Sequence, residues 1–421
     1  SEFAGRVPIE LSGGSLFPPV GQLTYLLTLP PYGFYWFILA AESDTPSWHT
    51  PAPEQMPDYI TVVLRDKLAE VIASSTATEI ERDALPSYLG MRRWFAAKDQ
   101  KLKSARIASV GRLPGGDREL LLCEVAVETD GGTSRWSLPL SMVWDDETAS
   151  ALPTQLALAR VRRGRRVGLL TDAFSVPAFA QQMLAALAAG TRIDTGDGQI
   201  VFEPTPDRID VLQRPADAPV LWLSAEQSNS SLIVDDAVML KIFRRIASGQ
   251  HPEAEMGRYL TAQGFANAPL LLGEVARIDA AGERHSLAVA QSFVRNQGDA
   301  WSWTLNQFNR ALDDLATREA SADARDDNVE DYLSLAGTIG RQLGIMHTVL
   351  ARPTDEEAFT PRRAGPKDVV EWIRRANGLL ENAFVAIGQR ANWENETTEV
   401  EVRDLLAGIG DDALPLTWTD V

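Results

Sequence analysis

The stretch from Leu221 to Phe243 restricts the fold of this chain more than any other. It opens with a short apolar strand that runs into a loop of small hydrogen-bonding residues, 224–230. A second strand at 231–234, the tight turn Asp235-Asp236 and a third strand at 237–243 follow. Strands joined by so short a turn pair antiparallel, so the sequence predicts a sheet with a polar loop at one end.

In the third strand a lysine lies between large apolar side chains. Alternation puts Lys241 on the same face as Met239 and Phe243, and Pro252 then opens a helix whose first turn contains Glu253 and Glu255. A polar loop can bind a phosphate tail through N–H groups and hydroxyls. A strand lysine can neutralise the α/β-phosphates while a helix glutamate holds it in place. This order of residues indicates a nucleotide site and predicts a Lys241–Glu255 ion pair within about 4 Å.

The same residues also fit a plainer interpretation. Strand lysines are commonly surface residues, and Ser/Asn loops are common turns. The loop lacks the glycines of the G-x-G-x-x-G pattern, and the chain has no G-x-x-x-x-G-K-[ST] motif. Spacing alone therefore leaves the nucleotide site open.

Composition excludes several classes of protein. Hydrophobic residues make up 45% and charged residues 23% of the 421, the balance of a globular protein of about three domains. With 40 Lys and Arg against 58 Asp and Glu, the formal charge is −18, which disfavours nucleic-acid and anionic-membrane partners. A phosphate ligand therefore needs a local cationic pocket.

Cysteine and histidine usage predicts a cytoplasmic protein with no metal site of its own. The single Cys123 cannot form an intrachain disulfide, and the four histidines show no zinc-ligand spacing. The apolar run from Leu23 to Ala41 contains Pro30, Pro31 and Gly33, which favours a buried β-hairpin over a membrane span.

Changes in pattern divide the chain into five parts. Residues 1–40 read as a β-module and residues 41–58, rich in Pro, Ser, Thr and acids, as a linker. Residues 59–205 predict an α+β cap unit, residues 206–294 an antiparallel sheet with one helix, and residues 295–421 a helical region. The cap unit is expected to contain helices at 59–80, 85–98 and 169–187, and strands at 107–110, 119–128 and 135–143.

Several segments resemble the maltokinase family, which is similar to aminoglycoside and choline kinases and carries an added N-terminal cap domain. They are LPSYLGMRRWFAAK (85–98), SAEQSNSSLIVDDAVMLKIFRR (224–245), HPEAEMGRYL (251–260) and QSFVRNQGDAW (291–301). Residues 3–39 resemble the closing β-domain of trehalose synthase. This order resembles that of trehalose synthase-maltokinase fusion proteins, so the chain resembles an internal fragment of one.

The resemblance implies a fold, a set of ligands and roles for particular residues. It implies an α+β fold with a β-module, a cap domain, a protein-kinase-like (aminoglycoside-phosphotransferase-like) small lobe and an incomplete helical large lobe. It implies ATP and Mg²⁺ as cofactors, maltose as the substrate, and an upstream trehalose synthase barrel in the same polypeptide. The product would be maltose 1-phosphate. The implied nucleotide-binding residues are Gln227, Ser228, Asn229, Ser230, Lys241 and Glu255, with Gln291, Phe293 and Val294 at the adenine hinge.

One family motif is missing from this chain. The catalytic segment of the form H-G-D-x-H-x-G-Q does not occur, so no catalytic residue is assigned here and its aspartates are expected after Val421. The fragment is accordingly expected to be inactive by itself. Two other interpretations remain: a non-catalytic carbohydrate-binding or interaction module, and a kinase of another small hydroxylated substrate. We also expect the β-module either to pack on the cap domain or to leave Phe34, Tyr35, Trp36 and Phe37 partly exposed.

Overall fold

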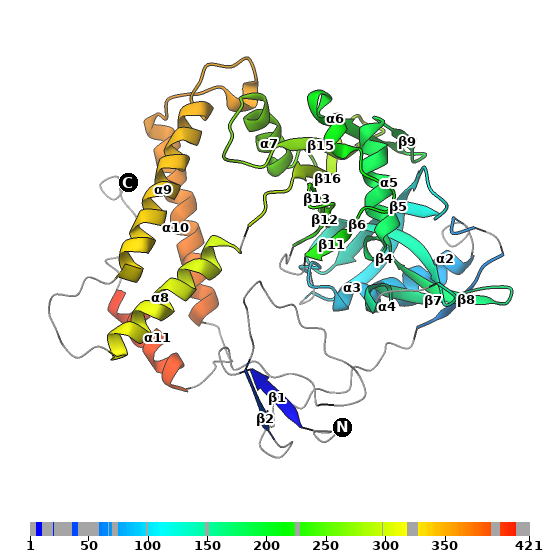
Figure 1. Ribbon diagram of the computed structural model, residues 1–421, viewed down its shortest axis with the longest axis horizontal. Coiled ribbons are helices and arrows are strands. Elements are labelled where there is room, and N and C mark those ends of the chain that lie inside the picture. The colour runs from blue at the N-terminus through cyan, green and yellow to red at the C-terminus, as the bar shows by residue number, and fades with distance from the viewer. Residues whose placement is uncertain are drawn as a thin grey trace. The chain divides into compact units, whose positions relative to one another are not determined.

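The computed structural model of the chain forms two compact units, drawn in Figure 1. One comprises Ser1–Ala254 and Leu271–Phe293, and the other comprises Glu255–Leu270 and Val294–Val421. The structure describes residues 6–10, 20, 36–40, 59–65, 67–69, 75–97, 100–147, 151–223, 228–296, 298–317, 327–388 and 396–409.

The first unit contains a seven-stranded sheet, here called the cap sheet, with the order β3-β7-β8-β6-β5-β4 and β14 paired to β6. All its pairs are antiparallel except β3 with β7. Its strands are β3 (Thr61–Val63), β4 (Leu102–Leu113), β5 (Leu120–Thr129), β6 (Gly132–Trp144), β7 (Ala157–Arg163), β8 (Arg166–Asp172) and β14 (Arg245–Ile246). The π-helical turn η3 (Ile80–Ala84) and helix α3 (Leu85–Met91) pack with its strands in one apolar core, and helix α2 (Ser75–Glu79) precedes η3.

A second seven-stranded sheet of the same unit, here called the lobe sheet, is antiparallel throughout. Its order is β11-β12-β13-β16-β15-β10-β9. The strands are β9 (Arg192–Asp194), β10 (Gly198–Pro204), β11 (Val220–Leu223), β12 (Asn229–Val234), β13 (Val238–Phe243), β15 (Leu271–Asp279) and β16 (Arg284–Ser292). In chain order helix α7 (Pro252–Ala262) comes between β13 and β15. The α+β class and the antiparallel sheet are confirmed, and the described part of the interval 206–294 contains two α-helices rather than one, α6 (Ile209–Leu212) and α7.

The two sheets share an apolar core. Helix α5 (Pro177–Ala188) packs there against strands of both sheets, with the short helix α6 (Ile209–Leu212) beside it. After β13 the chain leaves the lobe sheet and pairs with the cap sheet through β14, where Arg245 lies opposite Trp136. Figure 1 shows α5 and both sheets side by side. The first unit is therefore a single packed body in which the cap sheet supports the lobe sheet.

The three helices predicted for the cap unit are each wrong in part, and one strand within the predicted bounds of that unit belongs to the lobe sheet. Residues 61–63 form strand β3 rather than a helix, because the buried side chains alternate with period two, Val62 and Leu64 facing the core. Residues 169–172 end strand β8, and the helix starts only at Pro177. Strand β10, placed by its sequence in the cap unit, pairs with β15 of the lobe sheet. Helix α3 ends at Met91, earlier than expected.

The described part of the second unit is helical, as predicted. Its elements are α8 (Ala300–Thr317), α9 (Asp327–Leu350), the 3-10 turn η6 (Glu357–Phe359), α10 (Pro366–Gly388) and α11 (Glu396–Ile409). A small apolar cluster joins Leu260 and Phe265 to Val349 of α9. Many other apolar side chains of these helices are exposed. None of the helices in the described part of the chain is long and apolar enough to cross a membrane.

Near the N-terminus β1 (Val7–Glu10) pairs antiparallel with β2 (Phe37–Ala40). Trp36 has 65% of its surface exposed and Phe37 is half-buried, in line with the expected aromatic patch. Phe34 and Tyr35, and the linker up to residue 58, lie outside the described residues.

Candidate functional site

The hairpin of β12 and β13 places the candidate lysine. Its turn residues Asp235 and Asp236 have φ values of +54° and +47°, the left-handed pair that a two-residue hairpin turn requires. This turn sets the register, in which Ser231 lies opposite Lys241 and Leu232 opposite Leu240. Leu232 and Leu240 belong to the shared core, so Ser231 and Lys241 lie together on the other face of the sheet.

Lys241 forms an ion pair with Glu253, and the predicted Lys241–Glu255 pair stays a prediction. Its Nζ lies 3.2 Å from Oε2 of Glu253, in the first turn of α7, and 18% of the lysine side chain is exposed. The predicted partner Glu255 belongs to the second unit. Residues two apart in a helix point in different directions, so the phase of α7 against β13 selects Glu253.

His251 is a neighbour of this ion pair that the sequence interpretation missed. Its ring stacks on Phe243 of β13, with centroids 3.8 Å apart and an angle of 17° between the planes. The ring Nδ1 accepts the backbone N–H of Glu253, and the backbone N–H of His251 donates to Oγ of Ser286. Burial lowers the pKa of His251, Lys241 lowers it further and Glu253 opposes both. The imidazole therefore favours its neutral form and holds the start of α7 against the sheet.

The polar loop is described from Ser228 onward. Gln227 lies outside the described residues. Ser228 is exposed and Asn229 begins β12, opposite Phe243. Ser230 faces the interior, where its Oγ accepts a hydrogen bond of 2.7 Å from Nε of Arg244. Its hydroxyl is therefore already engaged on the face of the sheet opposite Lys241.

Ser231 is the more informative hydroxyl of this segment. Its Oγ is fully buried, has no hydrogen-bond partner among the described residues and lies on the same face as Lys241. A buried hydroxyl without a partner is costly, so a ligand oxygen beside Lys241 would satisfy it. Position in the strand could have indicated this residue, since alternation from Leu232 assigns its face.

The predicted adenine hinge lies at the end of β16. Gln291 is buried between Met239 and Leu271 in the sheet register. The N–H of Phe293 donates to the carbonyl of Ala237 at 2.8 Å, so this donor is occupied. Val294 is exposed and belongs to the second unit. The hinge assignment remains a prediction.

A second cluster of polar groups lies at the turn between β15 and β16. Asp279, Glu283 and His285 are the one set of His and acidic side chains in the described ranges that could share a cation. Asp279 already accepts N–H bonds from Ala281 and Glu283 and contacts Nε2 of His285. The N–H of Glu283 and then His285 lower the pKa of Asp279. These side chains therefore hydrogen-bond within the turn between β15 and β16.

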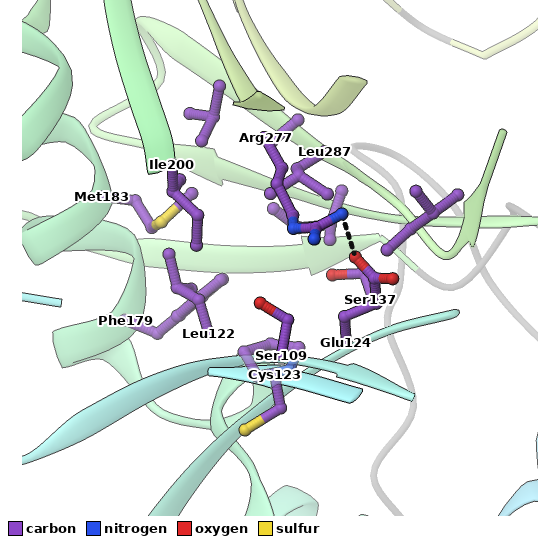
Figure 2. A pocket seen from close by; sticks show the side chains of 15 residues that line it. Ser109, Leu122, Cys123, Glu124, Ser137, Phe179, Met183, Ile200, Arg277 and Leu287 are labelled. Atoms are coloured by element: carbon purple, nitrogen blue, oxygen red, sulfur yellow. Dashed lines mark ion pairs between the residues drawn. The ribbon is translucent and has the colours of Figure 1, made fainter. Parts of the chain in front are cut away.

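A small cavity lies between the two sheets, and Figure 2 shows its lining. Its volume of about 20 Å³ is enough for one water molecule. Glu124 of β5 and Arg277 of β15, both buried, form an ion pair of 3.4 Å at its edge. Asp197 pairs with the same arginine at 2.6 Å. This cavity is therefore a water-sized gap between the two sheets.

Two family models match the chain. Residues 88–175 match the maltokinase N-terminal cap domain, and residues 1–36 match the C-terminal domain of maltogenic amylase. The first match covers β4 to β8 and lies within the predicted cap unit.

Similar proteins come from two groups. A trehalose synthase from Pimelobacter sp. (strain R48) is 57% identical over 44 residues, 10% of this chain and 8% of the relative. The trehalose synthase/amylase TreS of Mycolicibacterium smegmatis is 51% identical over 45 residues, 11% of this chain and 8% of the relative. A glucosamine kinase from the same species is 26% identical over 193 residues, 44% of each chain. The chain spans less than half the length of the curated relatives it matches.

Among solved structures, a glucosamine kinase in complex with glucosamine, ADP and inorganic phosphate is similar at 16% identity. The TM-score is 0.41, over 84% of this chain and 66% of that one. Another crystal form gives 18% identity and a TM-score of 0.40, over 83% of this chain and 64% of that one. The resemblance read from the sequence is confirmed in both parts by the two family models and the trehalose synthase matches.

Proposed function

We propose, on the premise that this chain is a fragment of the trehalose synthase-maltokinase type, that it supplies the nucleotide side of an ATP-dependent maltose kinase. The maltokinase cap domain at residues 88–175 supports a sugar-kinase type of function. The finer proposal is transfer of the ATP γ-phosphoryl group to maltose, giving maltose 1-phosphate. The parent protein would also carry a trehalose synthase barrel ahead of residues 1–36.

The observation that carries the proposal is the Lys241–Glu253 ion pair beside the unpartnered Ser231 hydroxyl. A lysine held by a helix glutamate presents its charge in one place, which is what a phosphate tail requires. Part of the lysine side chain is exposed, and Ser231 has a hydroxyl on the same face of the sheet. With an overall charge of −18, such a local cation is needed to attract ATP.

The residues near Lys241 fit the nucleotide better than the metal. Glu253 is the carboxylate that the structure pairs with Lys241, and a carboxylate engaged in this way is a poor Mg²⁺ ligand. Mg²⁺ would neutralise charge on the phosphates when bound. We assign it no ligand among the described residues and expect its aspartates in the H-G-D-type segment.

The test compares the chain with a version extended beyond Val421. Each is incubated with ATP, Mg²⁺ and maltose, and ADP release is followed. We expect turnover only in the extended protein, because positioning of the acceptor and of Mg²⁺ needs carboxylates from the other half of the site. Equal turnover by the shorter chain would contradict the proposal.

Lys241→Ala in the extended protein should lower kcat by at least about 100-fold, through loss of charge stabilisation. Lys103→Ala is the matched control. Lys103 also forms an ion pair of 3.2 Å, with Asp130, but on an exposed part of β4. Equal losses in the two variants would show that Lys241 has no special role.

A second candidate acceptor follows from the similarity to glucosamine kinase over 193 residues. We propose glucosamine as the alternative substrate, and the same assay with glucosamine in place of maltose separates the two. A higher kcat/KM for glucosamine would replace maltose in the proposal. ATP binding without turnover on either sugar, even in the extended protein, would favour a non-catalytic module.

A further inference from the structure

Arg244, the residue after β13, is a charged side chain buried in the first unit. Only 1% of it is exposed, and its Nη2 lies 2.8 Å from Oδ2 of Asp172, which is fully buried. Asp172 ends β8 of the cap sheet, so this ion pair joins the chain of the lobe to the cap. The guanidinium also lies over the rings of Trp94 and Phe174, at 5.0 Å and 5.4 Å from their centroids.

The three nitrogens of Arg244 reach three different elements. Nη2 contacts Asp172, Nη1 donates to the carbonyl of Ser137 in β6, and Nε donates to Oγ of Ser230 at 2.7 Å. The backbone carbonyl of Arg244 also accepts the N–H of Ser137. Ser230 is the second residue of β12, next to the partly buried Asn229 and close to the exposed Ser228.

The cap holds Asp172 in turn. Oδ2 accepts the hydroxyl of Tyr88 from α3 at 3.0 Å, and Oδ1 accepts the backbone N–H of Phe174 at 3.0 Å. Burial, and then Asp172, raise the pKa of Tyr88 well above its usual range, so the phenol keeps the proton that it donates. A rigid path of hydrogen bonds therefore runs from α3 through Asp172 and Arg244 to Ser230.

Stability alone is a weak reason for this arrangement. Removing two charges from water is expensive, and apolar replacements of buried ion pairs are often as stable. A planar guanidinium with three fixed partners does something that apolar packing cannot, because it sets the position of each partner.

We propose that Arg244 is a positioning residue through which Asp172 of the cap fixes the start of β12, and with it the turn at Ser228 and Asn229, for binding a nucleoside polyphosphate. The inference rests on the proposed nucleotide site beside Lys241. It assigns the cap a part in nucleotide binding, although no cap residue need touch the ligand. The cap sheet and the lobe sheet then act as one rigid body that holds this turn in position for the ligand.

The sharpest variant is Ser230→Ala, which removes the last hydrogen bond of the path and leaves the ion pair intact. Ser141→Ala is the control, since Ser141 is a fully buried strand serine whose hydroxyl donates to the carbonyl of Glu119 within the cap sheet. We expect both to lower Tm by similar small amounts. Titration of the full chain with ADP should show about tenfold weaker binding for Ser230→Ala and less than about twofold for Ser141→Ala.

A second pair of variants tests the arginine itself. Arg244→Lys keeps the charge beside Asp172 but cannot reach three partners, so it should match Ser230→Ala in ADP affinity. Arg244→Met combined with Asp172→Asn leaves no unpaired buried charge and should fold. Backbone hydrogen exchange of Asn229 to Ser231 should become at least about tenfold faster in each of these variants and stay unchanged in Ser141→Ala.

The outcomes separate the two proposals. Unchanged ADP affinity and unchanged exchange in Ser230→Ala overturn the positioning role. Loss of Tm alone, equal in Ser230→Ala and Ser141→Ala, assigns the network a purely structural part and also overturns it. If the unaltered chain does not bind ADP, the nucleotide site fails, and the exchange of residues 229–231 still decides whether Arg244 positions the strand.

Discussion

The two units differ in how far their apolar side chains are buried. In the first, strands and helices of both sheets bury their apolar faces in two large cores, and buried charges such as Arg244 have partners. In the second, α9 and α10 carry apolar side chains at helical spacing, yet many of these are exposed, including Leu379 at 72%. Helical periodicity is therefore sufficient to define an amphipathic helix, while burial also needs a covering surface.

The largest expected effect contrasts one tryptophan from each unit. Trp136 of β6 is 2% exposed and contacts Trp94 and Phe95 at ring distances of 5.8 Å and 5.0 Å. Trp136→Ala should lower the free energy of unfolding by about 3–5 kcal/mol, because it leaves a cavity. Trp372→Ala in α10, where half of the side chain is exposed, should cost less than about 1 kcal/mol. Urea unfolding followed by circular dichroism measures both, and similar costs would remove the contrast between the units.

The next effect concerns ion pairs. Asp172→Ala leaves Arg244 buried without its carboxylate and should destabilise the first unit by about 3 kcal/mol. Glu371→Ala removes a pair of 2.6 Å with Arg374 on the exposed side of α10 and should leave Tm unchanged. A thermal scan of the two variants tests this, and a clear loss of Tm in Glu371→Ala would contradict it.

A smaller effect is the pH dependence of the first unit. The pKa of His251 is lowered below its usual value of about 6.5, so the unfolded chain binds more protons than the folded one near pH 6. This contribution to stability is present above pH 6.5 and is lost as the pH falls through that range. Tm should therefore fall between pH 7 and pH 5, and His251→Gln should fall less steeply. An unchanged slope in the variant would show that other groups are responsible.

The smallest perturbation is a labelling experiment that leaves stability untouched. Burial raises the pKa of the Cys123 thiol in β5, so Ellman's reagent should react with it only when the cap sheet opens. A cysteine introduced in the second unit by Leu379→Cys should react immediately, because that position is exposed. Fast labelling of Cys123 in native conditions would mean that the first unit opens far more readily than its cores indicate.

Several elements could be predicted because their signals are local. Strands β5 and β6 carry long apolar runs, and the Asp235-Asp236 hairpin sets its own register, so both follow from neighbouring residues. The face of Lys241 follows from the same alternation. Short elements have weaker signals. At β3, three residues cannot distinguish a strand from one helical turn, so the predicted helix is wrong there.

The choice of partners depended on the tertiary structure. The sequence by itself determined that a lysine on β13 is followed by a helix with glutamates in its first turn, and that a polar turn precedes the hairpin. The tertiary structure decided that Glu253 pairs with Lys241, that Ser230 is bonded to Arg244, and that β10 extends the lobe sheet. The physical reason is distance along the chain. Alternation and helical period act between near neighbours, whereas the phase of α7 and the meeting of Arg244 with Asp172 depend on how separate elements pack into common cores.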